Sequence, residues 1–317
     1  MLTHSLYILG GMVLLALGAE GLVRGSTGLA LRLGITSLVI GLTVVAFGTG
    51  SPELVLSIRA AAAGNGGIAL GNVVGSNISN ICLVLGVAAL LKPMHVRSEL
   101  IRREMPIMIA VTVMLIAMLI DGTLSRLDGG VLVASAVAYT VLSYVMAKRG
   151  DTRQVEAEFD AAVANDARPV WQDALMLSIG LVALLIGASM LLKGAVFIAE
   201  GLGVSQVVIG LTVIAIGTSL PEMATSVSSA LRGEADVAFG NVIGSNVLNI
   251  LAVLGVAALI RPIAVQGLSS IDLAVMVASA ALVLPIMWRG SILNRWEGAL
   301  LLTGYVVYVG SLIGKSF

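Results

Sequence analysis

The sequence has little charge and few residues that bind soft metals. Only 11% of its 317 residues are charged, whereas an average soluble domain has about 25%, so a soluble globular domain is excluded. The net charge is zero, so no basic surface indicates a nucleic acid partner. Cys82 is the only cysteine, which excludes a disulfide within one chain and a cysteine metal cluster.

The sequence is instead rich in apolar residues. They make up 58% of the chain and recur in runs of about 20 residues, the length of a membrane-crossing helix. We therefore predict an all-α polytopic membrane protein with ten transmembrane helices. No basic segment or clear cleavage site accompanies the first run, so we interpret it as a retained span. The predicted spans cover residues 5–23, 35–58, 68–91, 105–120, 129–147, 172–199, 204–231, 237–260, 271–288 and 297–314.

Lysine and arginine predict the orientation of these spans. The segments that follow odd-numbered spans carry 13 of the 18 basic residues, and the opposite side carries 5. Because basic residues accumulate on the cytoplasmic side, we predict both termini outside the cell and a cytoplasmic linker at residues 148–170. We expect a prokaryotic cell (inner) membrane. The acidic residues Glu104, Asp121, Asp128 and Asp272 fall at span ends, where we expect a charge to cost little.

The chain contains an internal repeat. Residues 41–93 align with 210–262 without a gap, at a constant offset of 169 and with 29 identities in 53 positions. Both copies keep the pattern Gly-Asn-Val-x-Gly-Ser-Asn-x-x-Asn. We therefore predict two five-helix repeats, residues 1–147 and 171–317. Five spans separate equivalent points, so the second copy crosses the membrane upside down, as in many secondary transporters with a midplane site.

Each repeat interrupts an apolar span with a short polar sequence. Residues 48–53 read GTGSPE and residues 217–222 read GTSLPE. Pro52 has no N–H, so it removes one helical hydrogen bond and predicts a kink. Helical spacing then places a carboxylate, a hydroxyl and a carbonyl on one face. That face comprises Ala46, Thr49, Glu53 and Ser57 in the first copy and Ala215, Thr218, Glu222 and Ser226 in the second.

The following span of each repeat carries a second polar face. It comprises Asn72, Ser76, Asn77 and Asn80 in one copy and Asn241, Ser245, Asn246 and Asn249 in the other. These side chains could bind an ion or could join helices by hydrogen bonds, and the residues leave both interpretations open. The combined set offers only oxygen ligands, which suit hard cations such as Ca²⁺. Two carboxylates balance one Ca²⁺ or about two Na⁺, which gives competitive exchange a physical basis.

GTGSPEL with GNVVGSNISN, and GTSLPEM with GNVIGSNVLN, resemble the two α-repeats of the Ca²⁺/cation antiporter superfamily. The resemblance is greatest to the prokaryotic sodium/calcium exchangers and covers essentially the whole chain. It implies Glu53 and Glu222 as shared Ca²⁺ and Na⁺ ligands, and spans 1 and 6 that slide to give alternating access. The other ligands that it implies are Thr49, Thr218, Ala46, Ala215, Ser76, Ser245, Asn80 and Asn249.

Two positions depart from the family pattern. Gly50 replaces the second hydroxyl of the usual GTSxPE, whereas Ser219 keeps it, so one Na⁺ site is expected to lack a ligand. Asn249 stands where many relatives have Asp, which weakens the case for K⁺ co-transport. We expect Ca²⁺ and Na⁺ as transported substrates, the lipid bilayer as surroundings, and no permanently bound cofactor.

Three other functions remain open on the sequence alone. An H⁺/Ca²⁺ antiporter of the same fold would exchange protons at the two glutamates, although the second acid of proton-coupled relatives is replaced by Gly-Ser-Asn. An intramembrane enzyme would use two membrane carboxylates, but the sequence has no GxGD or HExxH motif. A cation channel would need an uninterrupted water path. We expect a transporter and no enzyme.

Overall fold

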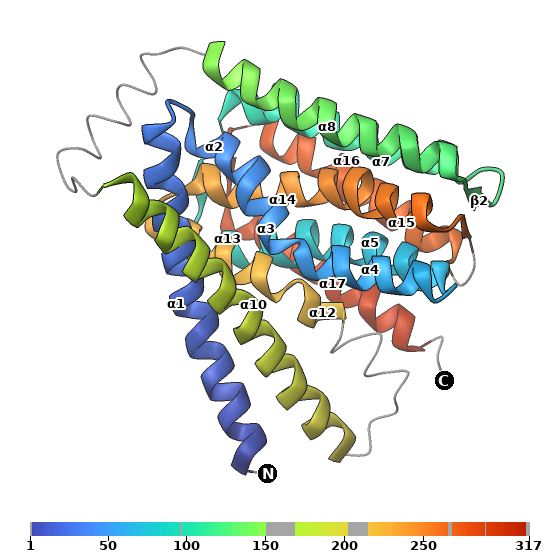
Figure 1. Cartoon of the computed structure of the whole chain (residues 1–317), viewed down its shortest axis with the longest axis horizontal. Helices are drawn as coiled ribbons and strands as arrows, with labels where there is room; N and C mark the ends of the chain where they lie inside the picture. Colours follow the sequence, from blue (N-terminus) through green and yellow to red (C-terminus); the bar gives the residue numbers. More distant parts are fainter. Residues whose placement is uncertain are drawn as a thin grey trace.

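The computed structural model describes residues 2–95, 97–149, 169–201, 215–265, 268–288 and 290–314, and helices make up most of them (Figure 1). The first half contains α1 (Leu2–Arg32), α2 (Ser37–Ile40), η1 (Gly41–Val45), α3 (Ala46–Thr49), α4 (Ser51–Ala62), α5 (Gly66–Ser79), η2 (Asn80–Val84), α6 (Leu85–Leu91), β1 (Met94–His95), η3 (Leu100–Glu104), α7 (Met105–Met118), β2 (Thr123–Leu124) and α8 (Arg126–Arg149). The elements η1, η2 and η3 are π-helical turns.

The second half follows a similar order in the residues that the structure describes. It contains α10 (Val170–Gly201), α12 (Ala215–Thr218), α13 (Leu220–Arg232), α14 (Ala235–Leu248), the π-helical turn η5 (Asn249–Leu254), α15 (Gly255–Ile260), β3 (Ile263–Ala264), α16 (Ser270–Trp288), β4 (Ile292–Leu293) and α17 (Arg295–Gly314). The all-helical prediction did not include the four two-residue strands.

Within the described residues, seven helices are long and apolar enough to cross a membrane. A bent pair, Ser37–Thr49 and Ser51–Ala62, makes an eighth candidate, with an angle of 47° between its parts. Two predicted spans fall outside this group. For the span predicted at 105–120, the regular α-helix α7 has only 14 residues. For the span predicted at 204–231, residues 204–214 lie outside the described part of the chain, as do 150–168 of the predicted linker.

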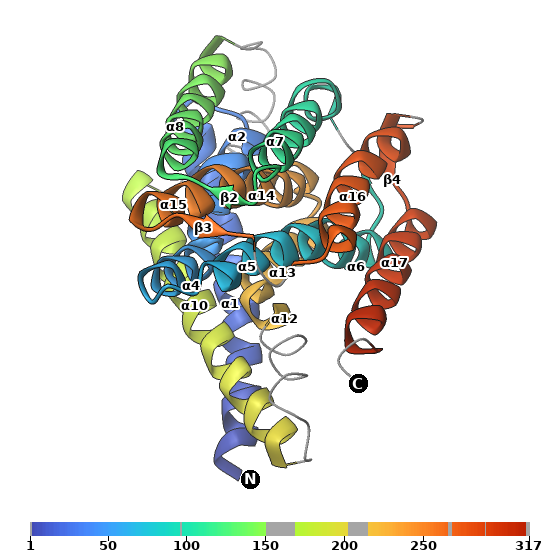
Figure 2. The ribbon, with the colours of Figure 1, turned by 90° about the vertical axis from the view of Figure 1, so that its right-hand side faces the viewer.

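The centre of the molecule is formed by the two continuous segments α5–α6 and α14–α15. In each, 78% of the most apolar window is buried inside the protein, against 17–33% in the other five candidate spans. Every residue of α14 from Val237 to Leu248 is buried. Figure 2 shows α14, α5 and α13 surrounded by the other helices. These two segments carry the GNV motifs, so the polar faces lie at the protein centre and away from lipid.

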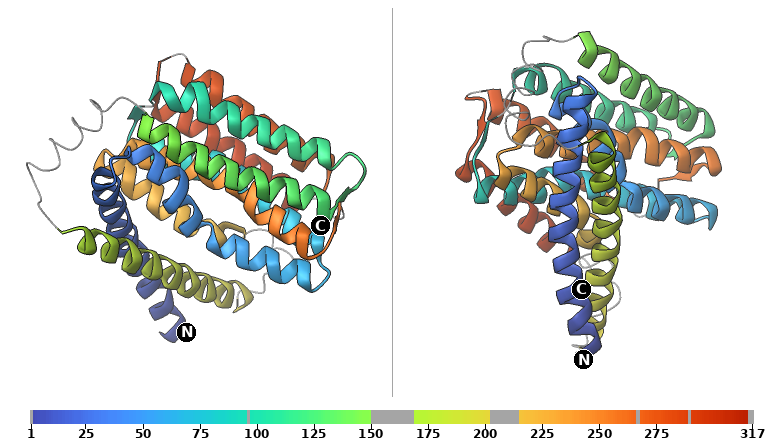
Figure 3. Two further views of the ribbon diagram at one scale, coloured as in Figure 1. Left: turned by 45° about the horizontal axis from the view of Figure 1, so that its top comes forward. Right: turned by 60° about the vertical axis from the view of Figure 1, so that its left-hand side comes forward.

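The two longest helices, α1 and α10, pack along each other and extend beyond the other helices (Figures 1 and 3). Glycines allow this close approach. A Cβ on Gly11 would lie 2.7 Å from the Gly187 carbonyl oxygen, and one on Gly18 would lie 2.8 Å from the Gly180 carbonyl oxygen. Gly180 and Gly187 are the repeat counterparts of Gly11 and Gly18. Small residues at such crossings let helix backbones meet in a membrane.

The short strands also follow the offset of the repeat. β1 pairs with β4 and β2 pairs with β3, both antiparallel. The pair Met94–Leu293 becomes Ile263–Leu124 when each residue is replaced by its counterpart 169 positions away, and both pairs are in register. An exchange of partners between copies is what a twofold relation between the two repeats produces.

Candidate cation site

Each interrupted helix breaks at the residue before its Pro-containing turn. α3 ends at Thr49 and α4 begins at Ser51, so Gly50 lies between them with φ −77° and ψ 5°. α12 and α13 meet in the same way at Ser219, with φ −86° and ψ 6°. Pro52 and Pro221 occupy the first turn of the following helix, where a missing N–H does no harm. The predicted interruption is thus present in both copies.

The break gives one carbonyl a local partner. Ser51 donates from Oγ to the Gly48 carbonyl oxygen at 2.8 Å. Pro52, four residues after Gly48, has no N–H to donate to that carbonyl. The Ala46 carbonyl accepts from the Gly50 N–H at 3.0 Å and keeps a second lone pair. Ala215 begins α12, and its side chain lies outside the described part of the structure.

The two glutamates lie at the first turns of α4 and α13, and each is only 1% exposed. They come close enough to interact with each other. Glu53 also lies beside Thr218, and Glu222 lies beside Thr49, so each carboxylate meets the threonine of the other copy. The two helix breaks therefore face each other across one centre.

Half-helix ends add to the electrostatics of this centre. The carboxylates sit at helix N-termini, whose partial positive charge favours anions. Thr49 and Thr218 end α3 and α12, and carbonyls at such C-terminal ends favour cations. The two helix breaks thus stabilise the glutamate carboxylates and direct backbone carbonyl oxygens toward the same centre.

The serines of the GNV motifs lie against this centre. Ser76 donates from Oγ to Glu53 Oε1 at 3.4 Å. Its counterpart Ser245 is 1% exposed, and its Oγ has no hydrogen-bond partner in the described residues. Ser219 likewise has a buried Oγ without a partner among them.

Asparagines connect the central helices. Asn72 donates from Nδ2 to the Glu53 carbonyl at 3.3 Å and to Ser57 Oγ at 3.1 Å. Asn241 makes the equivalent contacts with the Glu222 carbonyl and with Ser226, and it accepts from Thr49 Oγ1 at 3.0 Å. These two amides position the glutamate-bearing helices, so the helix-joining interpretation applies to them.

The inner asparagines cross the interface between the two copies. Asn80 donates to Asn246 Oδ1 at 3.3 Å, and Asn249 donates to Asn77 Oδ1 at 3.1 Å. Asn80 and Asn249 begin the π-helical turns η2 and η5. Such turns are frequent at functional sites because the extra residue redirects a side chain. The Oδ1 of Asn80 keeps no partner in the described residues.

The centre therefore holds several buried oxygens without partners. In the described part of the chain these are Glu53 Oε2, both carboxylate oxygens of Glu222, Asn80 Oδ1, Ser219 Oγ and Ser245 Oγ. A buried acceptor without a partner costs about 1–3 kcal/mol, and a charged one costs more. None of the ion pairs among the described residues includes either glutamate. A bound cation would satisfy this set.

A cavity of 880 Å³ extends along α5 toward the centre. Its inner wall includes Asn72, Ser76 and Thr218, and its mouth includes Asn65 and Arg261. Gly71 and Gly75 of α5 also line it. The cavity therefore comes within one side chain of Glu53, which does not itself line it.

Comparisons with known proteins agree with this geometry. Residues 3–145 and 173–314 match the family described as sodium/calcium exchanger protein. The chain belongs to the sodium/calcium exchanger family. It is 41% identical to CaxA of Alkalimonas amylolytica over 313 residues, covering 97% of this chain and 98% of that protein. It is 34% identical to the sodium/calcium exchanger MaX1 of Methanosarcina acetivorans over 277 residues, covering 77% of this chain and 79% of that protein.

Solved structures of this exchanger family share the fold. A structure of the sodium-calcium exchanger NCX_Mj, soaked with zero Na⁺ and Ca²⁺, has a TM-score of 0.84 and 33% identity. The similarity covers 98% of this chain and 99% of that chain. The predicted family is confirmed, and the chain is a membrane protein of a cation antiporter family.

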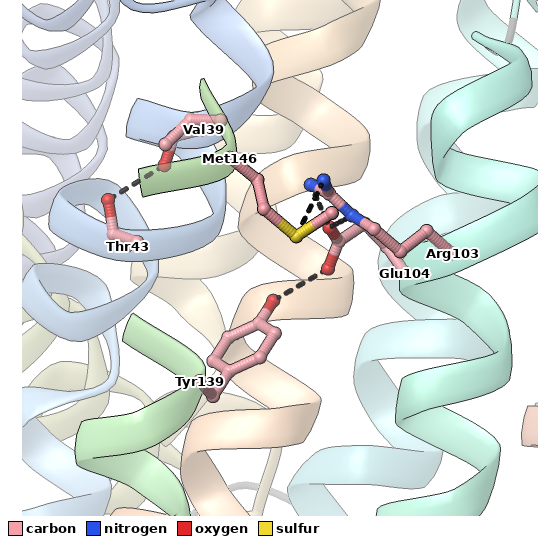
Figure 4. Close-up of polar contacts among 6 residues, drawn as sticks. All are labelled: Val39, Thr43, Arg103, Glu104, Tyr139 and Met146. Atoms are coloured by element: carbon pink, nitrogen blue, oxygen red, sulfur yellow. Dashed lines mark hydrogen bonds and ion pairs between the residues drawn. The ribbon is translucent and has the colours of Figure 1, made fainter. Parts of the chain in front are cut away.

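Two acidic residues outside the centre differ from the sequence prediction. Glu104 is fully buried, contacts Arg103 and accepts from the Tyr139 hydroxyl at 3.0 Å (Figure 4). Asp272 is also buried and accepts from the Tyr308 hydroxyl at 3.0 Å. The expectation that a charge costs little at these span ends did not include their burial, and helix packing encloses both carboxylates. The tyrosines, which are repeat counterparts, lie 35 and 36 residues away in sequence.

Proposed function

We propose that this exchanger-family protein exchanges Na⁺ for Ca²⁺ across the membrane at the central oxygen site. The observation that carries the proposal is the pair Glu53 and Glu222, buried together with three carboxylate oxygens that lack partners in the described residues. Two negative charges in a membrane interior are strongly unfavourable without cations. One Ca²⁺ or two Na⁺ would neutralise them, and the ions would replace one another.

The donor set supports hard cations. Carboxylate, hydroxyl, amide and carbonyl oxygens surround the centre, and Ca²⁺ takes six to eight such ligands. We assign the metal site to the residues that the two copies contribute. They are Glu53, Glu222, Thr49, Thr218, Asn80, Asn249, Ser76, Ser245, Ala46, Ala215 and Ser219. Ser76 and Ser245, with Ala46 and Ala215, would serve flanking Na⁺ sites.

We further propose the complete architecture that this function needs. Ten spans would form two inverted repeats, residues 1–147 and 171–317, joined by a cytoplasmic linker at 148–170 with both termini outside. The exchanged partners of the four strands and of the α1–α10 glycines support the two-repeat arrangement. Binding at one site between two inverted repeats suits alternating access, in which the site opens to one side at a time.

Transport driven by defined gradients tests the proposal. Proteoliposomes containing the protein would be loaded with Na⁺, K⁺ or choline, with or without an imposed pH gradient, and ⁴⁵Ca²⁺ uptake would be measured. We expect uptake that requires internal Na⁺. Uptake driven only by the pH gradient would replace this proposal with H⁺/Ca²⁺ antiport. Absence of uptake, with protein that still binds Ca²⁺ in a thermal-shift assay, would also contradict it.

A further inference from the structure

Three acidic residues are buried away from the central glutamates, and two of them are paired with an arginine. Among the described residues these are Glu104, Asp173 and Asp272, with exposed fractions of 0%, 4% and 8%. Glu104 Oε1 lies 2.6 Å from Arg103 Nε, and Asp173 Oδ2 lies 2.6 Å from Arg32 Nε. No ion pair among the described residues includes Asp272. A buried charge is costly unless it is compensated, and Asp272 lacks the compensation that the other two acids have.

The repeat places Asp272 at the position of an arginine. Subtracting 169 gives Arg103, and the counterpart of Glu104 is Leu273. The first copy therefore has a neutral Arg-Glu pair where the second copy has one negative charge. The tyrosine that donates to each carboxylate, at 3.0 Å in both copies, occupies the same repeat position. The tyrosine contact is thus shared by the two copies, and the charge balance is not.

Asp272 lines the 880 Å³ cavity. It lies in the first turn of α16, which packs against α5 (Figure 2). The inner wall of the same cavity includes Ser76, which donates to Glu53. Asp272 Oδ1 accepts from the Tyr308 hydroxyl, and Oδ2 accepts from the Ser269 N–H at 2.8 Å. Each carboxylate oxygen therefore keeps a lone pair for a further ligand.

The other charged residue among those that line this cavity does not neutralise Asp272. Arg261 lies at the mouth and is exposed, and its Nη1 lies 2.7 Å from where a Cβ on Gly64 would be. No ion pair joins it to Asp272 in the described residues. Salt screens exposed charges strongly and buried ones much less. The cavity wall therefore presents a negative charge to a cation that enters.

A second cavity, of 260 Å³, shows the opposite case. It is lined by His95, Arg97 and residues 233–236, and Arg97 Nε lies 2.5 Å from Asp236 Oδ2. Asp236 is the repeat counterpart of Gly67, which lines the larger cavity. Asp236 thus has an arginine of the protein as its partner, whereas the acid of the larger cavity has none in the described residues.

We propose that Asp272 is a cation site on the wall of the larger cavity, where Ca²⁺ or Na⁺ binds transiently before it reaches the central glutamates. The proposal rests on the cation exchange proposed above. A solvated cation supplies the positive charge that Asp272 lacks. A cleft with one sign of charge on a low-dielectric wall raises the local concentration of the opposite ion and its association rate. Asp272 should therefore affect how much Ca²⁺ transport requires, and not the rate at saturating Ca²⁺.

Asp272 also caps α16, and a matched residue separates this role from cation binding. The Ser269 N–H donates to Asp272 Oδ2, and the Asp272 N–H donates to Ser269 Oγ at 3.4 Å, as in a capping box. Ser125 and Asp128 form the same box at the start of α8, where the Ser125 N–H donates to Asp128 Oδ2 at 2.8 Å. Asp128 does not line the cavity. Asp128→Asn thus removes an equivalent capping charge and serves as the control.

The charge in the cavity can be measured without transport. In a Cys82→Ala background, Leu268→Cys places a single thiol on the cavity wall, four residues before Asp272. The purified full-length protein is treated with a trimethylammonium-bearing methanethiosulfonate or with its sulfonate-bearing analogue. The ratio of the two labelling rates, relative to the ratio for a free thiol in solution, reports the electrostatic potential near the reporter.

We expect a ratio that favours the cationic reagent and that falls about fivefold in Asp272→Asn, as for one charge at roughly 8 Å in water. Asp272→Glu keeps the charge and should keep the ratio, and Asp128→Asn should leave it unchanged. With Asp272 in place, the ratio should also fall as ionic strength rises. That measurement tests the charge without any substitution at Asp272.

Uptake of ⁴⁵Ca²⁺ into proteoliposomes tests whether the charge serves transport. At low ionic strength, Asp272→Asn should raise the Ca²⁺ concentration for half-maximal uptake about fivefold, because a divalent ion feels the same charge twice as strongly. The maximal rate should not change, and the difference should shrink at high ionic strength. A purely capping role would instead lower thermal stability or the maximal rate without this salt dependence.

Three results would overturn the site. One is a labelling ratio that stays the same when the Asp272 charge is removed. Another is an equal fall in Asp128→Asn, which would reduce the effect to overall charge or to a lost cap. The third is an unchanged half-maximal Ca²⁺ concentration in Asp272→Asn, which would place the charge outside the cation route. Each can occur in a protein that exchanges Na⁺ and Ca²⁺. A protein without Ca²⁺ uptake under any gradient would contradict the proposed function, and the labelling ratio would still decide whether the cavity attracts cations.

Discussion

The two copies of the interrupted helix have the same backbone and different surroundings. Gly50 and Ser219 share φ and ψ within about 10°, and Asn72 and Asn241 donate to the carbonyls of Glu53 and Glu222 at the same 3.3 Å. Ser76 contacts Glu53 in one copy. In the other copy, Ser245 and both oxygens of Glu222 lack partners among the described residues.

This comparison separates what builds the site from what sets its ion preference. The backbone break and the outer asparagines are duplicated, so they depend on motif residues common to both copies. The hydroxyls differ at Gly50, whose counterpart is Ser219, and the cavity linings differ at Gly67, whose counterpart is Asp236. Substituting residues that both copies share should abolish transport. Exchanging residues that differ between the copies should change the stability of the protein or its Na⁺ dependence.

The largest effect is expected from neutralising either carboxylate. Glu53→Gln or Glu222→Gln leaves one charge for a divalent ion, and ⁴⁵Ca²⁺ uptake should fall at least about 100-fold because a buried cation then lacks charge compensation. Glu99→Gln, on an exposed segment, serves as the control. Uptake at the wild-type rate in either variant would remove that glutamate from the site.

Gly240 and its counterpart Gly71 should differ in how well they tolerate a side chain. Gly240→Ala forces a Cβ to within 2.7 Å of the Leu38 carbonyl, whereas the nearest described atom to a Cβ on Gly71 is at 3.9 Å. We expect Gly240→Ala to destabilise the protein by about 1–3 kcal/mol through overpacking and Gly71→Ala to have a much smaller effect. Thermal unfolding followed by tryptophan fluorescence checks this. Equal destabilisation by the two substitutions would contradict the difference in packing around the two glycines.

Exchanging the hydroxyl tests whether the first copy lacks a ligand. A Cβ on Gly50 would lie 3.8 Å from Glu222 Oε1 and 3.7 Å from Asn249 Oδ1, so a serine hydroxyl there can reach the centre. Gly50→Ser should lower the Na⁺ concentration for half-maximal exchange about threefold, and Ser219→Gly should raise it, since one hydrogen bond or ligand contributes about 1 kcal/mol. A Na⁺ dependence that does not move in either variant would show that this hydroxyl is not a ligand.

The smallest effects should come from the two motif serines. Ser76 contacts Glu53 at 3.4 Å, and Ser245 has no partner in the described residues. If both bind Na⁺, Ser76→Ala and Ser245→Ala should each weaken apparent Na⁺ affinity about twofold. An effect confined to Ser76→Ala would indicate that this serine only orients Glu53.

The sequence predicted the features that depend on neighbouring residues. The helix breaks follow from Gly and Pro, and the polar faces that include Glu53 and Glu222 follow from helical spacing. The structure buries both glutamates in the first turns of the helices that follow the breaks. The π-helical turns at Asn80 and Asn249 have no comparable local signal. They arise where one extra residue is accommodated in a packed helix.

Contacts between distant segments could not be predicted from one sequence. Glu104 and Asp272 were expected at span ends, but Tyr139 and Tyr308 reach them from other helices and packing buries both carboxylates. Arg97 and Asp236 lie 139 positions apart, and nothing near either residue indicates its partner. The strands were not predicted because each has only two residues, too few to show an alternating apolar pattern.

The central claim is that Ca²⁺ and Na⁺ use the same pair of carboxylates. Equilibrium ⁴⁵Ca²⁺ binding to the purified protein, measured against increasing Na⁺ at constant ionic strength, tests it most directly. We predict that Na⁺ displaces Ca²⁺ competitively and that Glu53→Gln and Glu222→Gln bind no Ca²⁺ over the same range. Ca²⁺ that stays bound at saturating Na⁺, or that binds equally well to both variants, would contradict the shared site.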